Sequence, residues 1–245
     1  MSTFDPQKLV TIAENQEKVY DAGKQMGKSE FWDKYQDYGN NTNYEFAFNG
    51  NRWNDETFTP THDMNLSYWG GNQMFYRCGI VDLKGALEKC GVTLNTKNCH
   101  AFGGCFQDSK IKIIPILDLT NADYSTNYMF ATTAVETIEK IISSVNTVYG
   151  TYMFQNATAL TDITFEGVIA KKIDIHWSPL NRASIESIIN VLSTTTSSLT
   201  LTLSKSAVNT AFGINVDDET TSPEGSEYYN LRHSKDNWAI SYLDA

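Results

Sequence analysis

The segment TYMFQNATAL (residues 151–160) repeats a pattern that stands 24 residues earlier, in NYMFATTAV (127–135). Looser copies of the same pattern surround MF (74–75) and CF (105–106), and AFNG (47–50) is a distorted first version. In the four clear copies a sulphur-containing residue precedes the phenylalanine, a small residue follows it by three positions, and an apolar residue or alanine follows it by five. The chain therefore contains an internal repeat.

The spacing of the phenylalanines sets the length of this repeat. Phe106, Phe130 and Phe154 are 24 residues apart, and Phe75 precedes Phe106 by 31, which is one period plus an insertion of seven. A fixed period of about 20–29 residues is typical of solenoids, because one such unit cannot bury its apolar face alone whereas stacked units share a core. We therefore predict that these four phenylalanines form the structural core of the repeat and stack as the rungs of one ladder.

The repeated unit resembles the BspA-like leucine-rich repeats of bacterial surface proteins. In those repeats an Ala-Phe-x-x-Cys-x-x-Leu turn leads into a short strand of the type x-x-Ile-x-Ile, and the fourth copy follows the same order of turn and strand. The resemblance extends over about residues 65–245 and is most specific in 154–168. It is looser at 110–119, where Pro115 stands in an expected strand, and in the irregular 83–99 region. It implies an α/β repeat fold, a leucine-rich-repeat solenoid of short strands with irregular or helical turns, preceded by N-terminal helices.

Three parts of the chain are expected on this basis. They are an N-terminal helical segment for attachment or capping (1–38), the leucine-rich-repeat solenoid (39–212), and an acidic loop with a terminal cap (213–245). The thin apolar stripe of a helix expected over 5–27 predicts either packing against the solenoid or pairing with copies of itself. An aromatic helix over 29–38 is expected to cover the open end of the first coil, since solenoid ends need capping.

Regular elements are expected after the four copies. Alternation of apolar and polar residues predicts strands at 173–175, 199–203 and 238–242, the second with its threonines facing outward. Ser184 is the expected N-cap of a helix with a buried isoleucine and leucine face, and 204–212 indicates a further helical turn.

The composition is that of a folded, acidic protein. The chain of 245 residues is 41% hydrophobic and 12% aromatic, and its formal net charge is −10. Because it lacks a cluster of Lys and Arg, we expect no binding to nucleic acid. No apolar run approaches the ~20 residues of a membrane-spanning helix and residues 1–9 are polar, so we expect neither membrane insertion nor a signal peptide.

Residues that usually carry catalysis are dispersed. The four histidines form no metal-spaced pair, and the four cysteines between 78 and 105 lack Cys-x-x-Cys spacing, so we expect free thiols in the core. The sequence also has no glycine-rich phosphate loop and no serine nucleophile elbow. We therefore predict that the protein is not an enzyme and has no catalytic residues, no cofactor and no metal site.

Surface recognition is the remaining function class. A solenoid presents a long rigid face, on which aromatic side chains can stack against a ligand at a small ordering cost. Candidate ligand-binding residues are Tyr68, Trp69, Tyr76 and Tyr124. Tyr128 and Tyr152 recur two positions before the repeat phenylalanine, so a structural role is equally open for them.

The predicted biology rests on a second resemblance. Residues 31–60 are similar to a module that precedes such repeats in phage and prophage proteins. This resemblance implies a non-enzymatic phage virion protein of the tail, fibre or baseplate, assembled in the host cytoplasm. Its repeats would bind a host-surface glycan or protein, and its first helix would bind other virion proteins or form a homo-oligomer. The alternative is a secreted or cell-surface bacterial leucine-rich-repeat adhesin; an intracellular protein–protein scaffold is a third class.

Overall fold

A computed structural model describes residues 43–50, 53–195 and 199–244. The helices expected over 5–27 and 29–38, and with them the attachment or self-association of segment 1–38, lie outside the described residues. The strands are short in the first half of the chain and longer in the second. In order, the elements are β1 (Met64–Asn65), α3 (Leu83–Cys90), β2 (Leu94–Asn95), β3 (Ile113–Ile114), β4 (Leu117–Asp118), β5 (Thr137–Ser143), β6 (Asp162–Gly167), β7 (Ile173–Asp174), α4 (Arg182–Asn190), β8 (Leu199–Ser204), α5 (Lys205–Phe212), the 3₁₀ turn η1 (Glu219–Thr221), α6 (Glu227–His233) and β9 (Trp238–Leu243).

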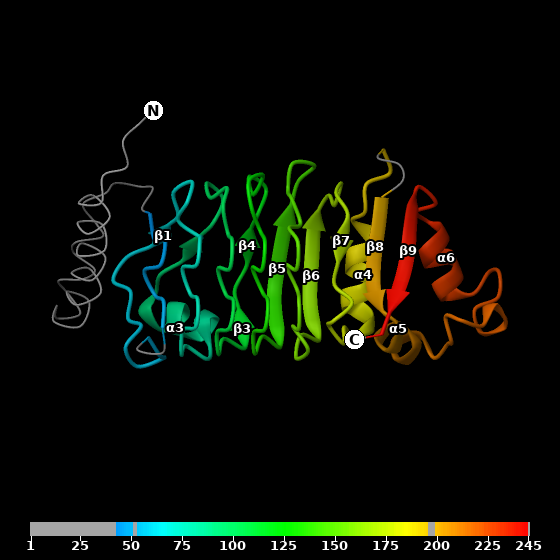
Figure 1. Ribbon diagram of the computed structural model, residues 1–245, viewed down its shortest axis with the longest axis horizontal. Coiled ribbons are helices and arrows are strands. Elements are labelled where there is room, and N and C mark those ends of the chain that lie inside the picture. The colour runs from blue at the N-terminus through cyan, green and yellow to red at the C-terminus, as the bar shows by residue number, and fades with distance from the viewer. Residues whose placement is uncertain (1–42, 51–52, 196–198, 245) are drawn as a thin grey trace, which may run out of the picture. The chain divides into compact units, whose positions relative to one another are not determined.

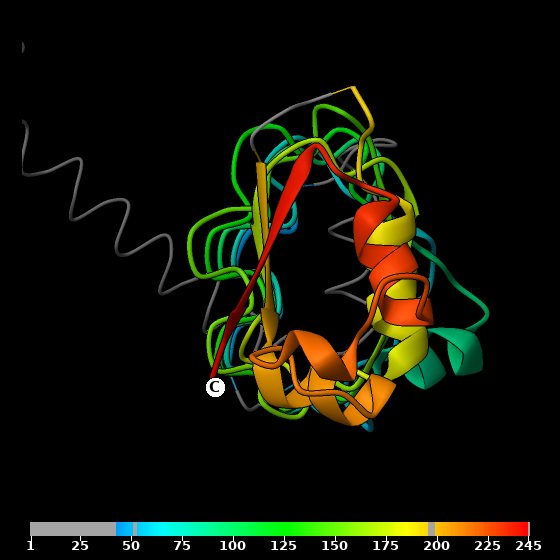
Figure 2. The same ribbon diagram turned by 90° about the vertical axis from the view of Figure 1, so that its right-hand side faces the viewer.

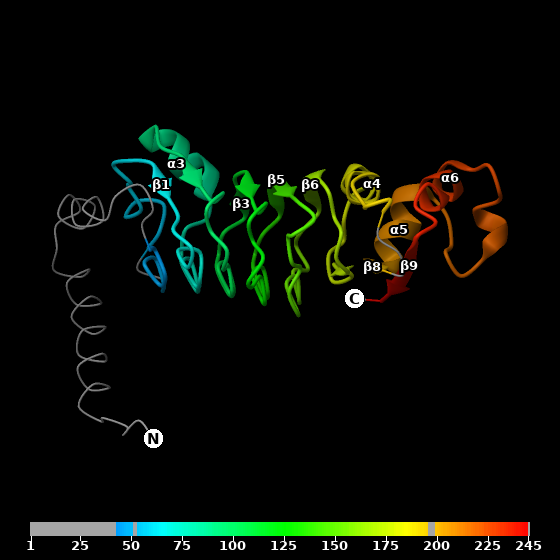
Figure 3. The same cartoon turned by 90° about the horizontal axis from the view of Figure 1, so that it is seen from above.

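The chain winds in successive coils that lie side by side (Figure 1). Every described strand pair is parallel: β1 with β2, β5 with β3, β4 and β6, and β8 with β7 and β9. Figure 3 shows two opposite faces, one with β5, β6, α4 and α6 and the other with β8 and β9, and Figure 2 shows the last helices opposite the last strands. We name the first the helix face. The second, the turn face, is built from the phenylalanine turns and then from β7, β8 and β9.

Hydrogen bonds along the stack hold the phenylalanine turns together. The amide of each repeat phenylalanine donates to the next coil, from Phe75 to Cys105 O (2.8 Å), from Phe106 to Met129 O (2.9 Å) and from Phe130 to Met153 O (2.8 Å). The residues two before and two after each phenylalanine have left-handed backbone dihedrals. They are Phe46, Gln73, Gly104, Tyr128 and Tyr152 before it, and Gly50, Arg77, Asp108, Thr132 and Asn156 after it. Their amides donate along the stack in the same direction where the next coil carries the turn. The turn is therefore one repeated conformation.

The rings of these turns form a single stack in the core. Adjacent centroids are 5.5 Å apart from Phe75 to Phe106, 5.5 Å from Phe106 to Phe130 and 5.2 Å from Phe130 to Phe154, with nearly parallel planes. Phe48 adds a fifth ring, 5.3 Å from Phe75. All five side chains are at most 1% exposed. Each buried ring contributes roughly 1.5–3 kcal/mol by burial and about 0.5–1.5 kcal/mol more through its aromatic neighbours.

Helix α3 explains the longer spacing between Phe75 and Phe106. It occupies the region that the sequence indicated only as irregular, with Asp82 as its N-cap and Gly91 as its left-handed C-cap. Pro115 also has a local effect: it separates β3 from β4, and both short strands pair with β5. A proline lacks the amide hydrogen that a continuous ladder would need.

The expected N-cap at Ser184 is wrong. Asn181 caps α4, and its side chain accepts the amide of Ser184 (2.9 Å). The serine hydroxyl instead accepts the amide of Ile163 on β6 (2.9 Å), and that of Ser187 accepts the amide of Phe165 (3.2 Å). The two serines thus satisfy amides at the edge of β6 where the next coil supplies a helix in place of a strand.

The C-terminal elements continue the stack. Residues 40–245 form one compact unit, so the boundary expected between 212 and 213 does not separate two bodies. Six residues of β9 pair with β8, and α6 lies within the segment expected to be an acidic loop and cap. The strands expected near 173, 199 and 238 and the helix near 204 are confirmed as β7, β8, β9 and α5.

Candidate binding site

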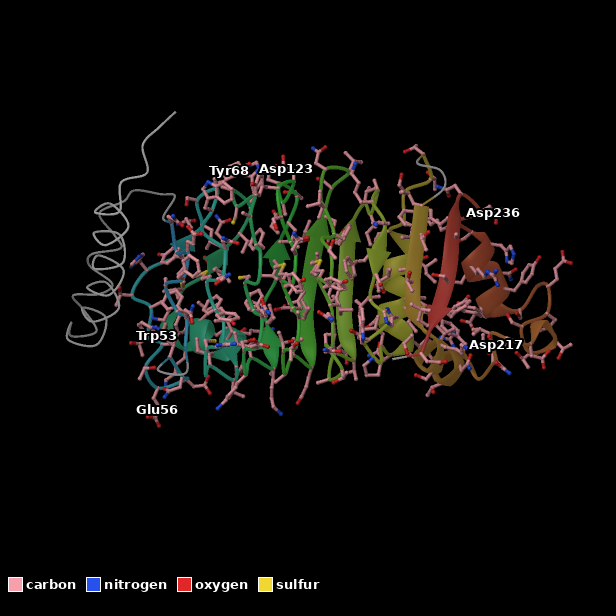
Figure 4. All side chains as sticks on the ribbon, viewed as in Figure 1. Trp53, Glu56, Tyr68, Asp123, Asp217 and Asp236 are labelled. Atoms are coloured by element: carbon pink, nitrogen blue, oxygen red, sulfur yellow. The ribbon has the colours of Figure 1, made fainter. Side chains whose placement is uncertain are left out.

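Four rings, three of them exposed and one half-buried, gather at one edge of the coils. We name Tyr68, Trp69, His100 and Tyr124 the aromatic cluster. The Tyr68 ring stacks on the His100 ring at 4.2 Å, and Tyr124 meets Trp69 edge-to-face at 4.7 Å. Tyr68 also contacts Trp69, with ring centroids 5.2 Å apart. Figure 4 shows Tyr68 and Asp123, which flanks the cluster, along the same edge.

The repeat brings this cluster together. The amides of His100 and Ala101 donate to the carbonyl of Tyr68, and the amides of Tyr124 and Ser125 donate to that of His100 in the same way. Tyr68, His100 and Tyr124 therefore occupy one register position on three successive coils. Their separations in sequence are 32 and 24 residues, because α3 lengthens the first interval.

An acidic partner orients the histidine. The Nδ1 atom of His100 lies 2.7 Å from the Oδ1 atom of Asp123, and the two side chains are 28% and 50% exposed. This contact fixes the plane of the imidazole that stacks on Tyr68. A residue held by a neighbour loses less rotamer freedom when a ligand binds.

The cluster is open to solvent before any ligand arrives. Tyr68 is 42% exposed, Trp69 41% and Tyr124 60%. Exposed aromatic residues in contact with one another are preorganised for binding, since they offer a large apolar area with few rotatable bonds. Three of the four residues predicted as ligand contacts thus lie together.

Tyr76, the fourth predicted contact, is not in the cluster. It is half-buried, and the guanidinium of Arg77 lies 4.7 Å from the centre of its ring. Tyr128 and Tyr152 form a separate pair on the turn face, with ring centroids 5.4 Å apart. His100 completes the cluster and Asp123 flanks it. Neither residue was predicted as a ligand contact, and only the alignment of coils could have indicated them.

A groove of about 500 Å³ begins at Tyr124. It lies on the turn face, where the turns of the central coils meet β7 and β8. Figure 2 shows these turns projecting beyond the plane of β8 and β9. The side chains used below are those of Tyr124, Tyr152, Lys172, Asp174, Thr200 and Thr202.

The groove is lined by hydroxyl, amide and charged groups of both signs. Asp174 Oδ1 lies 2.6 Å from Nδ1 of the buried His176, while its side chain stays 50% exposed. Lys172 has no ion-pair partner among residues 43–50, 53–195 and 199–244, and it is exposed. Such a surface can donate and accept hydrogen bonds along its length.

A second hollow, of about 350 Å³, lies between α6 and the 214–224 segment. The hydroxyls of Tyr228 and Tyr242 meet there at 2.6 Å, and burial raises the pKa of both phenols. Asp218, Glu224 and Arg232 surround it. The stacked rings of Tyr229 and His233 also line this hollow, but Tyr229 is half-buried. The groove begins at a cluster with three exposed rings, so it is the stronger candidate.

The buried thiols are not poised as nucleophiles. Cys78, Cys99 and Cys105 are buried, Cys90 is half-buried, and all four are free. Burial raises the pKa of Cys105 well above its ordinary value, whereas a reactive cysteine needs a lowered pKa. Among the described residues no three His, Cys, Asp or Glu side chains form a group that could hold a metal ion. No helix of the described ranges is long and apolar enough to cross a membrane.

Comparisons with family models, curated proteins and solved structures found no match to this chain.

Proposed function

We propose that the protein is a non-enzymatic recognition protein and that the aromatic cluster is its contact surface for a host-surface glycan or protein. The observation that carries this proposal is the preformed contact of Tyr68, Trp69 and Tyr124 on an exposed edge. Large aromatic rings that pack on one another and still remain exposed are typical of binding surfaces. A partner that covers them buries their apolar area, and this burial stabilises the complex.

We further propose that the repeats form a leucine-rich-repeat solenoid of the BspA-like type in a phage virion. The repeated turn sequence and the resemblance of residues 31–60 support this setting. Segment 1–38 would then bind other virion proteins or form a homo-oligomer. The alternative is a secreted or cell-surface bacterial adhesin of the same repeat type, which would use the same contact surface.

The first experiment tests recognition itself. Fluorescently labelled protein is incubated with a panel of bacterial cells, and retained fluorescence is measured on washed cells. The Trp69→Ala/Tyr124→Ala variant is expected to lose at least tenfold in affinity for any strain that the unmodified protein binds.

A control variant removes a different, partly exposed aromatic stack. Tyr229 stacks on His233 with ring centroids 3.9 Å apart, outside the aromatic cluster. Tyr229→Ala should bind cells as the unmodified protein does. Equal binding by the cluster variant and the unmodified protein would contradict the proposed site, and no binding to any strain would contradict recognition of bacterial surfaces.

A separate experiment distinguishes the two settings. Mass spectrometry of purified virions from an induced host should detect the chain at a constant ratio to the major tail proteins. Detection on the surface of uninduced cells, with none in virions, would favour the adhesin.

A further inference from the structure

We propose that the ligand is a carbohydrate chain of several sugar units, which stacks on the aromatic cluster and continues through the groove to Thr200 and Thr202. This inference rests on the proposed function and adds the chemical class of ligand and a second contact region. It also predicts that affinity depends on the length of the chain.

The aromatic cluster suits sugar rings. A sugar has an apolar C–H face and polar hydroxyl edges, so it packs against an aromatic ring while its hydroxyls stay hydrogen-bonded. Trp69 and Tyr124 meet at an interplanar angle of 74°, and Tyr68 is tilted by 58° to Trp69. The ring faces of the cluster therefore point in more than one direction. Such a surface fits several sides of a carbohydrate chain, whereas a single flat ring face would contact only one side.

The groove supplies the hydrogen bonds that an oligosaccharide needs. Alternation along β8 buries Leu201 and Leu203 and leaves Thr200 and Thr202 half-buried on the groove side. The Thr202 hydroxyl accepts a hydrogen bond from Ser241 (3.1 Å), so its own proton is available to a ligand. Threonine hydroxyls both donate and accept, as sugar hydroxyls do.

The charges in the groove favour a chain without a strong net charge. Lys172 and Asp174 belong to the same short segment, and both line the groove. A strongly anionic chain would be repelled by the Asp174 carboxylate, and a cationic segment by the Lys172 ammonium. Sugar hydroxyls can bind both groups, because an ammonium only donates and a carboxylate only accepts.

The groove and the cluster form one continuous surface. Tyr124 belongs to the cluster through its contact with Trp69, and it also lines the groove. From Tyr124 the groove crosses the following coil at Tyr152 and reaches β7 and β8. A ligand that fills both regions must extend over several coils, whereas a monosaccharide could occupy only one of them.

The first test separates a carbohydrate from a protein ligand on cells that the labelled protein binds. One sample of cells is oxidised with periodate, which cleaves vicinal diols of sugars, and another is digested with a broad-specificity protease. We expect periodate to abolish binding and protease to leave it unchanged. The reverse result would overturn the carbohydrate inference while leaving recognition through the cluster intact.

The second test measures the role of the groove. Envelope polysaccharide of a bound strain is partially hydrolysed and size-fractionated, and affinity for each fraction is measured by calorimetry. The affinity of the unmodified protein should rise with chain length, and the Thr200→Val/Thr202→Val variant should lose about three- to tenfold for long fractions only, since each hydroxyl contributes a modest net hydrogen bond.

Thr164→Val is the matched control. Thr164 is an exposed threonine on β6, on the helix face, so its substitution removes a strand hydroxyl away from the groove. Its affinity should equal that of the unmodified protein for every fraction. Length-independent affinity, or equal binding by the groove variant and this control, would contradict the groove while leaving the cluster as the contact surface.

Discussion

The two halves of the coil stack differ in the residues that have left-handed backbone dihedrals. In residues 43–160 the turn face consists of tight turns, and eight of the described residues other than glycine, between Phe46 and Asn156, have left-handed dihedrals. After Asn156, every left-handed residue of the described chain is a glycine: Gly167, Gly213 and Gly225. A left-handed dihedral costs roughly 1–2 kcal/mol for an ordinary residue and almost nothing for glycine.

This difference shows what stabilises a strained turn. In the first half, hydrogen bonds to the next coil and a stack of buried rings fix each turn from both sides, so its conformation does not depend on which residue occupies the left-handed position. In the second half, Gly167 is the last residue of β6, Gly213 follows α5 as its C-cap, and Gly225 lies in a turn. There the local sequence must supply the conformational freedom itself.

Removing an inner ring is the strongest test of this comparison. Phe106→Ala should reduce the free energy of unfolding by about 3–5 kcal/mol, because it opens a cavity between Phe75 and Phe130 and removes one stacked neighbour from each of these rings. Urea denaturation followed by circular dichroism measures the change. A decrease in the free energy of unfolding below ~1 kcal/mol would show that the ring stack does not stabilise the first half.

Alanine substitutions at two glycines distinguish destabilisation by lack of space from destabilisation by backbone strain. A Cβ atom on Gly150 would lie 2.5 Å from the backbone nitrogen of Asn127, so Gly150→Ala should cost about 1–3 kcal/mol or more by overpacking the turn. Gly213 has open space but a φ of +65°, so Gly213→Ala should cost only about 1 kcal/mol. Thermal denaturation ranks the two, and the opposite order would contradict this account.

Alkaline pH should act first on the half that contains the ring stack. Burial raises the pKa of Cys78 to about 12 and that of Cys99 to about 11, whereas an unfolded thiol has a pKa of ~8.5. Between these values the folded chain keeps protons that the unfolded chain releases. The stabilisation is therefore complete below pH ~8.5 and falls as pH rises, by up to ~1.4 kcal/mol per pH unit for each thiol.

Urea denaturation at pH 8 and pH 10 measures this effect. Cys78→Ala and Cys99→Ala should each flatten the loss of stability between these two values. The buried Tyr228 and the half-buried Tyr242 of the second half should contribute only above pH ~10, the ordinary pKa of an unfolded tyrosine. Stability that is unchanged from pH 8 to pH 10 would disagree with the burial of these thiols.

The smallest expected effect is a gain in stability. Thr132 is an exposed, β-branched residue with a φ of +54°, in a region that such residues rarely adopt. Thr132→Gly should raise the free energy of unfolding by about 0.5–1 kcal/mol, since the relief of strain exceeds the added entropy of glycine in the unfolded chain. The same urea titration tests it, and a destabilised variant would show that Thr132 has another role in the turn.

Local sequence was sufficient for the features that repeat. The spacing of the repeat phenylalanines was sufficient to place Phe75, Phe106, Phe130 and Phe154 in one stack. A residue that recurs at the same position of every repeat unit lies at the same place in every coil. The strands β8 and β9 could be predicted from alternation, since a half-buried strand needs a period of two. The N-cap at Asn181 could not be distinguished from Ser184, because both residues cap helices well and the choice depends on the edge of β6.

By itself, the sequence determined the repeat, its core rings and the acidic net charge. Only the tertiary structure decided which surface residues meet: Tyr68, His100 and Tyr124 share a register position because α3 absorbs the extra residues of one coil. The groove likewise exists because projecting turns adjoin the flatter strands β7 and β8. Core positions recur with the period and can be read along the chain, whereas surface contacts depend on how neighbouring coils align, which no local pattern encodes.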